Sequence, residues 1–196
     1  MTMIRVIGTS IATLCIAANV CLGQSPRPAP AMVSLTKALA GTWSATYSFI
    51  PEVPNAADTS ARGEVVWEPG PGGFTLLEKE HLSRVTGEQF LLMIQWWDDS
   101  THTFRGIRCD NSGAEACDVT SYANSTASWD GKAFVLDFRF VEGTRQMRWH
   151  GVWSNITATS FTETGDVGEA SSTLKRVLTI HATRVAQRSR DSSPAH

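Results

Sequence analysis

The 196-residue sequence lacks any block of charge of one sign. It carries 17 Lys and Arg residues against 19 Asp and Glu, a formal net charge of −2, and the basic residues are scattered singly. Proteins that bind nucleic acid gather basic residues into a patch or stripe, and polybasic segments do the same at anionic membranes. The charge pattern therefore indicates a partner that is neither a nucleic acid nor a charged membrane surface.

Motifs of the common enzyme classes are absent as well. The chain has no G-x-S-x-G, no H-E-x-x-H, no P-loop and no dinucleotide-binding fingerprint, so we expect no enzyme activity. Asp98, Asp99 and His102 are metal-ligating residue types, but they fall on a predicted hairpin turn, where Asp is common for structural reasons. We expect no metal site. Glu78 and Glu80 share one face of a predicted strand, which we interpret as a solvated face.

Long apolar runs are scarce too. One segment, residues 6–22, is mostly apolar, follows an arginine and ends near small residues, but Thr13 and Asn19 dilute it. These features are typical of a secretory signal, whereas a membrane span needs roughly 20 strongly apolar residues. We therefore expect a signal peptide at 1–23, with an uncleaved anchor as the alternative. The mature protein would be secreted or periplasmic, with no membrane insertion after cleavage.

The segments that flank the central region have little to bury. Residues 24–32 are rich in proline, which predicts an extended linker. Residues 187–196 are polar and aperiodic, which predicts a disordered tail. The intervening residues 33–186 have the length of one ordinary domain and can bury a hydrophobic core of their own.

Cysteine is sparse, because two of the 4 cysteines lie in the predicted signal. The remaining pair, Cys109 and Cys117, flanks DNSGAEA. In an exported protein this pair predicts a disulfide. A redox-active or metal-binding pair is the alternative, although the C-x-x-C spacing is missing.

Long helical patterns are also missing. A short helical turn is predicted at 33–40, and Gly41 ends it. After it come short stretches rich in aromatic and β-branched residues, separated by turn residues such as Asp130-Gly131. They predict strands at 42–50, 62–68, 73–83, 89–97, 102–109, 117–128, 132–140, 145–153, 159–165 and 173–184.

Alternation within these strands separates an apolar face from a wet face. Trp43, Ala45, Tyr47 and Phe49 share one face of the first strand, with Thr and Ser opposite. Such strands are typical of an antiparallel sheet that covers a core. A meander of about ten strands avoids exposed edges by closing on itself. The sequence therefore predicts an all-β fold, an antiparallel up-and-down barrel.

The start and end of the predicted barrel resemble the calycin superfamily, which includes the lipocalins. Gly41-x-Trp43 follows a helical turn and opens the first strand, and Arg184 lies on the apolar face of the last strand. The resemblance implies that Trp43 closes the barrel floor and that Arg184 packs over it. Stacking on the indole and hydrogen bonds to carbonyl groups would account for an arginine on that face.

The second half of the chain also resembles an uncharacterised family of secreted bacterial proteins with this lipocalin-like shape. The residues that carry the resemblance are Ile156, Thr157, Ser160, Phe161, Thr183 and Arg184. Together the two resemblances span residues 33–184. The uncharacterised family has no settled function to transfer.

The seven tryptophans suggest an apolar cup whose polar tips orient a ligand. We expect an exported protein that binds a small apolar or amphipathic ligand inside the barrel. The expected lining residues are Met93, Trp96, Phe138, Met147 and Trp149, with Tyr47 as a polar tip. The alternative is a barrel filled by its own side chains, acting as a structural or interaction module of the cell envelope.

His150 is the one candidate for a cofactor ligand. It lies between two tryptophans, and a related class of small barrels binds haem through a single histidine on a strand. The alternation, however, places His150 on the polar face with Gln146 and Arg148. We expect a surface histidine and no haem or other cofactor.

Overall fold

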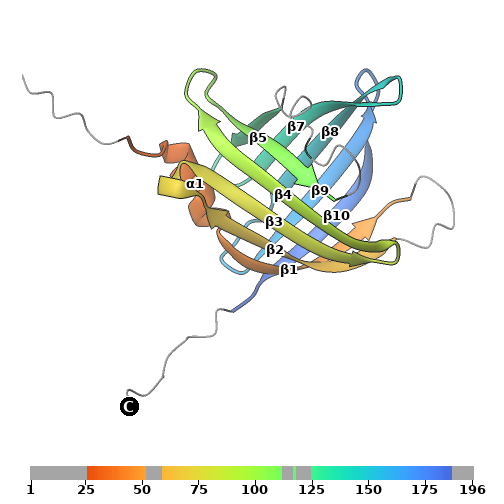
Figure 1. The fold of residues 1–196 in the computed structure, drawn as a ribbon, viewed down its shortest axis with the longest axis horizontal. Coiled ribbons are helices and arrows are strands. Elements are labelled where there is room, and N and C mark those ends of the chain that lie inside the picture. The colour runs from red at the N-terminus through yellow and green to blue at the C-terminus, as the bar shows by residue number, and fades with distance from the viewer. Residues whose placement is uncertain (1–25, 52–58, 112–116, 118–124, 187–196) are drawn as a thin grey trace, which may run out of the picture.

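The computed structural model describes residues 26–51, 59–111, 117 and 125–186. In these ranges ten antiparallel strands form a closed barrel, and one short helix precedes the first strand (Figure 1). The predicted all-β, up-and-down barrel is confirmed. The predicted signal peptide (1–23) and tail (187–196) lie outside the described residues.

Each strand pairs with the next along the chain, and β1 and β10 close the barrel. The elements are α1 (Pro30–Leu39), β1 (Gly41–Phe49), β2 (Ser60–Pro69), the 3₁₀ turn η1 (Pro71–Gly73), β3 (Thr75–Arg84), β4 (Gly87–Asp98), β5 (Thr103–Asp110), β6 (Thr126–Trp129), β7 (Phe134–Glu142), β8 (Arg145–Ser154), β9 (Ser160–Glu169) and β10 (Lys175–Arg184). The predicted strand at 117–128 overlaps only the short β6, and residues 118–124 lie outside the described part.

Helix α1 begins at Pro30, within the segment 24–32 that was expected to be a linker. Proline suits the first helical turn because its φ is already helical and its missing N–H would be unpaired there anyway. Met32, Leu35 and Leu39 lie on one face and are fully buried against the barrel core. The helix therefore closes the end of the barrel at which β1 begins (Figure 1).

Trp43 and Arg184 join the two ends of the chain at this closed floor. They are direct partners in the β1–β10 register, and the guanidinium carbon lies 3.9 Å from the centre of the indole ring. Arg184 donates hydrogen bonds to the carbonyl groups of Ala38, Ala40 and Ala158, and the Trp43 indole N–H donates to Leu39 O at 2.9 Å. Burial lowers the pKa of the guanidinium.

Aromatic side chains fill the half of the barrel next to α1. Trp43 meets Phe161 edge to face with ring centres 4.9 Å apart, and Phe104 and Phe134 meet in the same way at 5.7 Å. Trp153 adds a contact with Phe134 at 5.3 Å. All five side chains are at most 3% exposed, so the closed half is a packed core.

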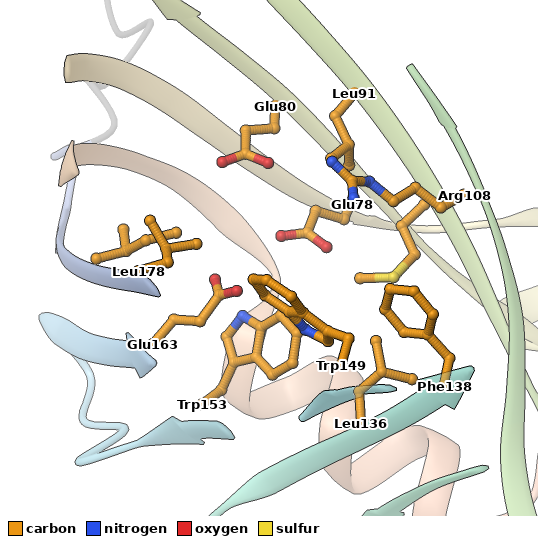
Figure 2. A pocket seen from close by; sticks show the side chains of 12 residues that line it. Glu78, Glu80, Leu91, Arg108, Leu136, Phe138, Trp149, Trp153, Glu163 and Leu178 are labelled. Atoms are coloured by element: carbon orange, nitrogen blue, oxygen red, sulfur yellow. The ribbon is translucent and has the colours of Figure 1, made fainter. Parts of the chain in front are cut away.

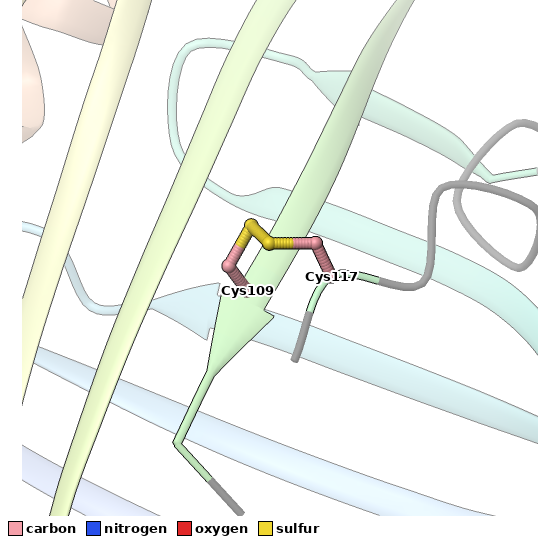
Figure 3. The surroundings of a disulfide bond; sticks show 2 residues. All are labelled: Cys109 and Cys117. Atoms are coloured by element: carbon pink, nitrogen blue, oxygen red, sulfur yellow. A yellow bond between two sulfur atoms is a disulfide. The ribbon is translucent and has the colours of Figure 1, made fainter. Parts of the chain in front are cut away.

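The predicted disulfide between Cys109 and Cys117 is present (Figure 3). Cys109 lies near the end of β5, and within the described residues the ladder between β5 and β6 is the pair Phe104 and Ala127 near the start of β5. Cys117 forms an isolated antiparallel bridge with Cys109. The disulfide thus ties residue 117 to the end of β5.

Candidate functional site

The half of the barrel away from α1 contains two adjacent cavities. The inner cavity has a volume of about 80 Å³ and the outer one, at the open end, about 530 Å³. They share the lining residues Glu80, Leu91, Arg108, Trp149 and Leu178. The two cavities therefore adjoin between the open end and the middle of the barrel.

Charged side chains converge on the inner cavity. Glu78 and Glu80 project inward from β3, Glu163 from β9 and Arg108 from β5. Figure 2 shows the three carboxyl groups pointing toward one space beside the rings of Trp149 and Trp153. These residues are far apart in sequence, and the closure of the barrel brings them together.

Two of the carboxyl groups are buried without a partner. Glu78 is 4% exposed and Glu163 is 8% exposed. Within the described part of the chain, neither carboxyl group has a hydrogen bond or an ion pair. Burial, and then the charge of Glu80, raises the pKa of both carboxyl groups, while Arg108 opposes the shift. Removing a carboxylate from water disfavours its charged form.

Tyr47 on β1 faces Glu80 at the junction of the two cavities. Its side chain is 1% exposed, and its hydroxyl makes no hydrogen bond of ordinary geometry. Burial raises the pKa of the Tyr47 hydroxyl, and the nearby Glu80 raises it further. The pKa of Glu80 is raised by burial, and Tyr47 and Arg108 limit that shift.

Arg108 is the basic residue that lines both cavities. Its guanidinium lies 3.6 Å from the Asp110 carboxylate, and about a third of its side chain is exposed. Its Nε is buried without a hydrogen-bond partner, as is the indole N–H of Trp153. The inner cavity is therefore lined by residues that carry donors as well as by carboxyl groups.

Four of the six predicted lining residues face these cavities. Met93, Phe138 and Trp149 line the inner cavity, and Tyr47 and Trp149 line the outer one. Met147 is buried and lines a third recess of about 450 Å³, which shares Ile50, Pro51, Val167 and Val177 with the outer cavity. The interior position predicted for Trp96 is wrong.

Trp96 lies on the outer face and is 36% exposed. On β4 the inward positions include Met93 and Gln95, which are both buried. Successive side chains of a strand point to opposite faces, so Met93 and Trp96, three positions apart, cannot both face inward. Trp96 was predicted to face inward because of its aromatic side chain, without regard to the alternation of side chains along the strand.

The solvated face predicted for Glu78 and Glu80 is also wrong. Both alternate in register with Leu76 and Leu82, which are buried, while Lys79 and His81 occupy the exposed face. This alternation is visible in the sequence, and it outweighs the usual preference of glutamate for water. Sequence analysis also missed Glu163 and Arg108, although each shares the inward alternation of its strand.

His150 lies on the outer face with its partners. Its Nδ1 is 3.1 Å from Asp137 Oδ2, and Arg148 donates two hydrogen bonds to the same carboxylate.

Asp98 accepts a hydrogen bond from the Ser100 backbone N–H at 2.9 Å, as a turn residue does. The Ser100 hydroxyl also lowers the pKa of Asp98. Across the described ranges, no cluster of three His, Cys, Asp or Glu residues could hold a metal ion.

Comparison with known proteins supports the architecture. No protein-family model and no curated protein matches the chain. Rv2717c from M. tuberculosis has a similar structure, with a TM-score of 0.54, 14% identity, and coverage of 81% of this chain and 99% of that protein. Because the identity is so low, this similarity supports the barrel fold alone. The expected kinship with an uncharacterised family of secreted bacterial proteins stays a prediction.

Two further solved structures align less well. An S-type phycobiliprotein lyase, CPES, from Guillardia theta has a TM-score of 0.48 at 9% identity, covering 83% of this chain and 100% of that one. A redesigned β-barrel, mFAP1, bound to DFHBI, has a TM-score of 0.39 at 12% identity, covering 76% of this chain and 97% of that one.

In the described ranges, no helix has the length and apolar character of a membrane span.

Proposed function

We propose that this protein binds a small amphipathic molecule in the open half of the barrel, with the polar end of the molecule directed inward. The observation that carries the proposal is the pair of adjacent cavities that share Glu80, Arg108 and Trp149, with Tyr47 beside them. A site with apolar walls and a few convergent polar groups is the usual form of a small-molecule site.

The walls of the outer cavity suit an apolar chain or ring. They are formed mainly by apolar side chains, among them Phe49, Leu82, Leu91, Trp149 and Leu178. Each methylene group of the ligand that such walls remove from water contributes about 0.8 kcal/mol to the free energy of binding. Arg84 and Gln89 also line the outer cavity, but the cluster of Tyr47, Glu80 and Arg108 lies where the two cavities adjoin and sets the orientation of the ligand.

The alternative, a filled barrel that acts as a structural or interaction module of the envelope, is favoured by the closed half. There the aromatic side chains, among them Phe134 and Trp153, fill the interior of the barrel. The two hypotheses differ in whether the open half holds a molecule in the native protein.

A second candidate function, proton transfer to a bound molecule, is favoured by the contact between Tyr47 and Glu80. Both groups have a raised pKa and lie where the outer cavity ends. A carboxylic acid kept neutral by burial can act as a general acid. Conversion of a captured ligand by wild-type protein, but not by Glu80→Gln, would support this candidate; an unchanged ligand would contradict it.

We also propose that the protein is exported, on the strength of the signal-like segment at its start. Expression of the whole chain in a bacterial host tests this. The expected result is a periplasmic protein whose mass matches a chain that begins at Gln24. A full-length protein retained in the membrane fraction would favour the uncleaved anchor.

Native mass spectrometry of periplasmic protein, compared with the same sample denatured, tests the binding proposal. The matched variants are Leu91→Trp, which fills the shared part of both cavities, and Leu92→Trp on the opposite face of the same strand. We expect a small-molecule mass increment in wild-type protein and Leu92→Trp that Leu91→Trp lacks. Equal native and denatured masses for the wild type would favour the filled barrel.

A further inference from the structure

We propose that the inner end of the site recognises a small organic cation, such as an ammonium group, on the ligand. This inference rests on the proposed function, because it assigns the chemistry of the molecule that enters the open half. The observation behind it is the convergence of Glu78, Glu80 and Glu163 on one space (Figure 2).

The charged side chains around that space favour a cation. The inner cavity is lined by three glutamates and one basic residue, Arg108. The guanidinium of Arg108 already faces the carboxylate of Asp110. A bound anion would therefore meet more carboxyl groups than cationic groups, whereas a bound cation would meet oxygen acceptors on two sides, from β3 and from β9.

The burial of Glu78 and Glu163 supports the same conclusion. Each is more than nine-tenths buried, lines the cavity and lacks a hydrogen bond or ion pair within the described ranges. A buried carboxyl group without a partner is costly, and here two of them face one cavity. A cationic group placed between them would supply charge-assisted hydrogen bonds to both.

Aromatic rings complete the surroundings of the cation. The rings of Trp149 and Phe138 stack with centres 6.2 Å apart, and Trp149 and Trp153 both line the inner cavity. Indole faces attract cations, and aromatic walls are a common partner of ammonium groups. Glu163 lies directly opposite Trp153 in the β8–β9 register, so acid and indole face the same space.

The three carboxyl groups line one cavity but do not form a metal-binding group. In the part of the chain that the structure describes, no three acidic, His or Cys side chains form a group that could hold a metal ion. Carboxylates on opposite walls suit a larger organic cation, which can reach each of them through separate N–H groups or through its polarised C–H surface.

Binding of a cation should also release a proton. The titratable groups that face Glu163 are Glu78, Glu80, Arg108 and Tyr47, while its neighbours on β8 and β10 are Trp153 and Ile180. Burial raises the pKa of Glu163 in the free protein. A cation beside the carboxyl group favours its ionised form, so the proton would leave as the ligand enters.

Isothermal titration with three octyl probes tests the inference: octylamine, octan-1-ol and octanoate. They share one apolar chain and differ in the charge of the head group. We expect octylamine to bind at least tenfold more tightly than the other two, with proton release that appears as a buffer-dependent enthalpy. Glu163→Gln and Glu78→Gln should each weaken octylamine about tenfold, or about 1.4 kcal/mol, with octan-1-ol unchanged.

The matched control is Glu64→Gln, which changes an exposed acid on the outer face of β2. It should bind octylamine as the wild type does. If octan-1-ol or octanoate binds as tightly as octylamine, the proposed function stands and the inference of a cation is overturned. If none of the three probes binds folded wild-type protein, both fail.

Discussion

The guanidinium carbon of Arg184 lies 3.9 Å from the centre of the Trp43 ring, so the last strand closes over the first at the floor of the barrel. Trp43 also donates a hydrogen bond to Leu39, the last residue of α1. One indole therefore links the helix, the first strand and the last strand. This arrangement closes one end of the barrel, and the cavities lie toward the other end.

Replacement of Trp43 by alanine should strongly destabilise the barrel. The side chain is fully buried, and large-to-small changes of this kind cost about 3–5 kcal/mol. Urea unfolding would measure the loss. Trp96→Ala is the matched control, since that indole lies on the outer face, and it should cost less than about 1 kcal/mol. Equal losses for the two variants would contradict the floor assignment.

Glu163→Gln should stabilise the ligand-free protein in a pH-dependent way. Because the folded pKa of Glu163 is raised, its contribution is fully present below the unfolded pKa of about 4.3 and is lost as the pH rises through the folded pKa. Glutamine does not titrate.

The free energy of unfolding of Glu163→Gln, relative to wild type, should therefore increase from pH 4 to pH 8. The slope cannot exceed about 1.4 kcal/mol per pH unit for one group. Urea unfolding at pH 4, 6 and 8 measures it, with Glu64→Gln as the exposed control. Parallel pH profiles for wild type and Glu163→Gln would show that this carboxyl group is not held neutral by burial.

Gly165→Ala should narrow the cavity by displacing Trp149. A Cβ at this position would lie 2.3 Å from the Trp149 ring, so the ring would have to move toward the space that it lines. We expect at least threefold weaker binding of octan-1-ol by titration calorimetry. At Gly168 on the same strand the nearest atoms would be 3.3 Å away, and Gly168→Ala should bind as wild type. Equal affinities of the two variants for octan-1-ol would contradict the assignment of Trp149 to the cavity wall.

The disulfide should contribute modestly to stability. Cys109 and Cys117 are separated by 8 positions, and closing so short a loop stabilises a protein by about 2 kcal/mol through chain entropy. The double variant Cys109→Ser/Cys117→Ser should lose about that much in urea unfolding, and reduction of the wild type should reproduce the loss. An unchanged free energy of unfolding would mean that the bridge does not constrain the unfolded chain.

The fold was predictable because its signals are local. Alternation in Trp43, Tyr47 and Phe49 depends only on the opposite orientation of successive side chains, and turn residues such as Asp130-Gly131 mark strand ends without any knowledge of distant partners. The position of Arg184 could be inferred from the same alternation. The helix was predicted near its true position, but its start at Pro30 was missed because proline was interpreted as part of a linker.

The candidate site was predicted only in part, because it depends on contacts across the barrel. Tyr47, Met93, Phe138 and Trp149 follow the inward alternation of their strands and line the cavities. Trp96 was chosen for its aromatic ring and is exposed. Glu78 and Glu80 were placed in water because acids are rarely buried, although their alternation with Leu76 and Leu82 indicates the interior.

By itself the sequence determined that this chain forms a closed antiparallel barrel with an aromatic floor, since strand periodicity and turn chemistry act over a few residues. Only the tertiary structure decided that Glu163 faces Glu78 and Glu80 across one cavity. Residues on β3 and β9 meet because the barrel closes. Local sequence patterns do not show which inward-facing side chains lie at the same level along the barrel axis. The burial that raises the pKa of these carboxyl groups, and with it their capacity to select a ligand, arises from that closure.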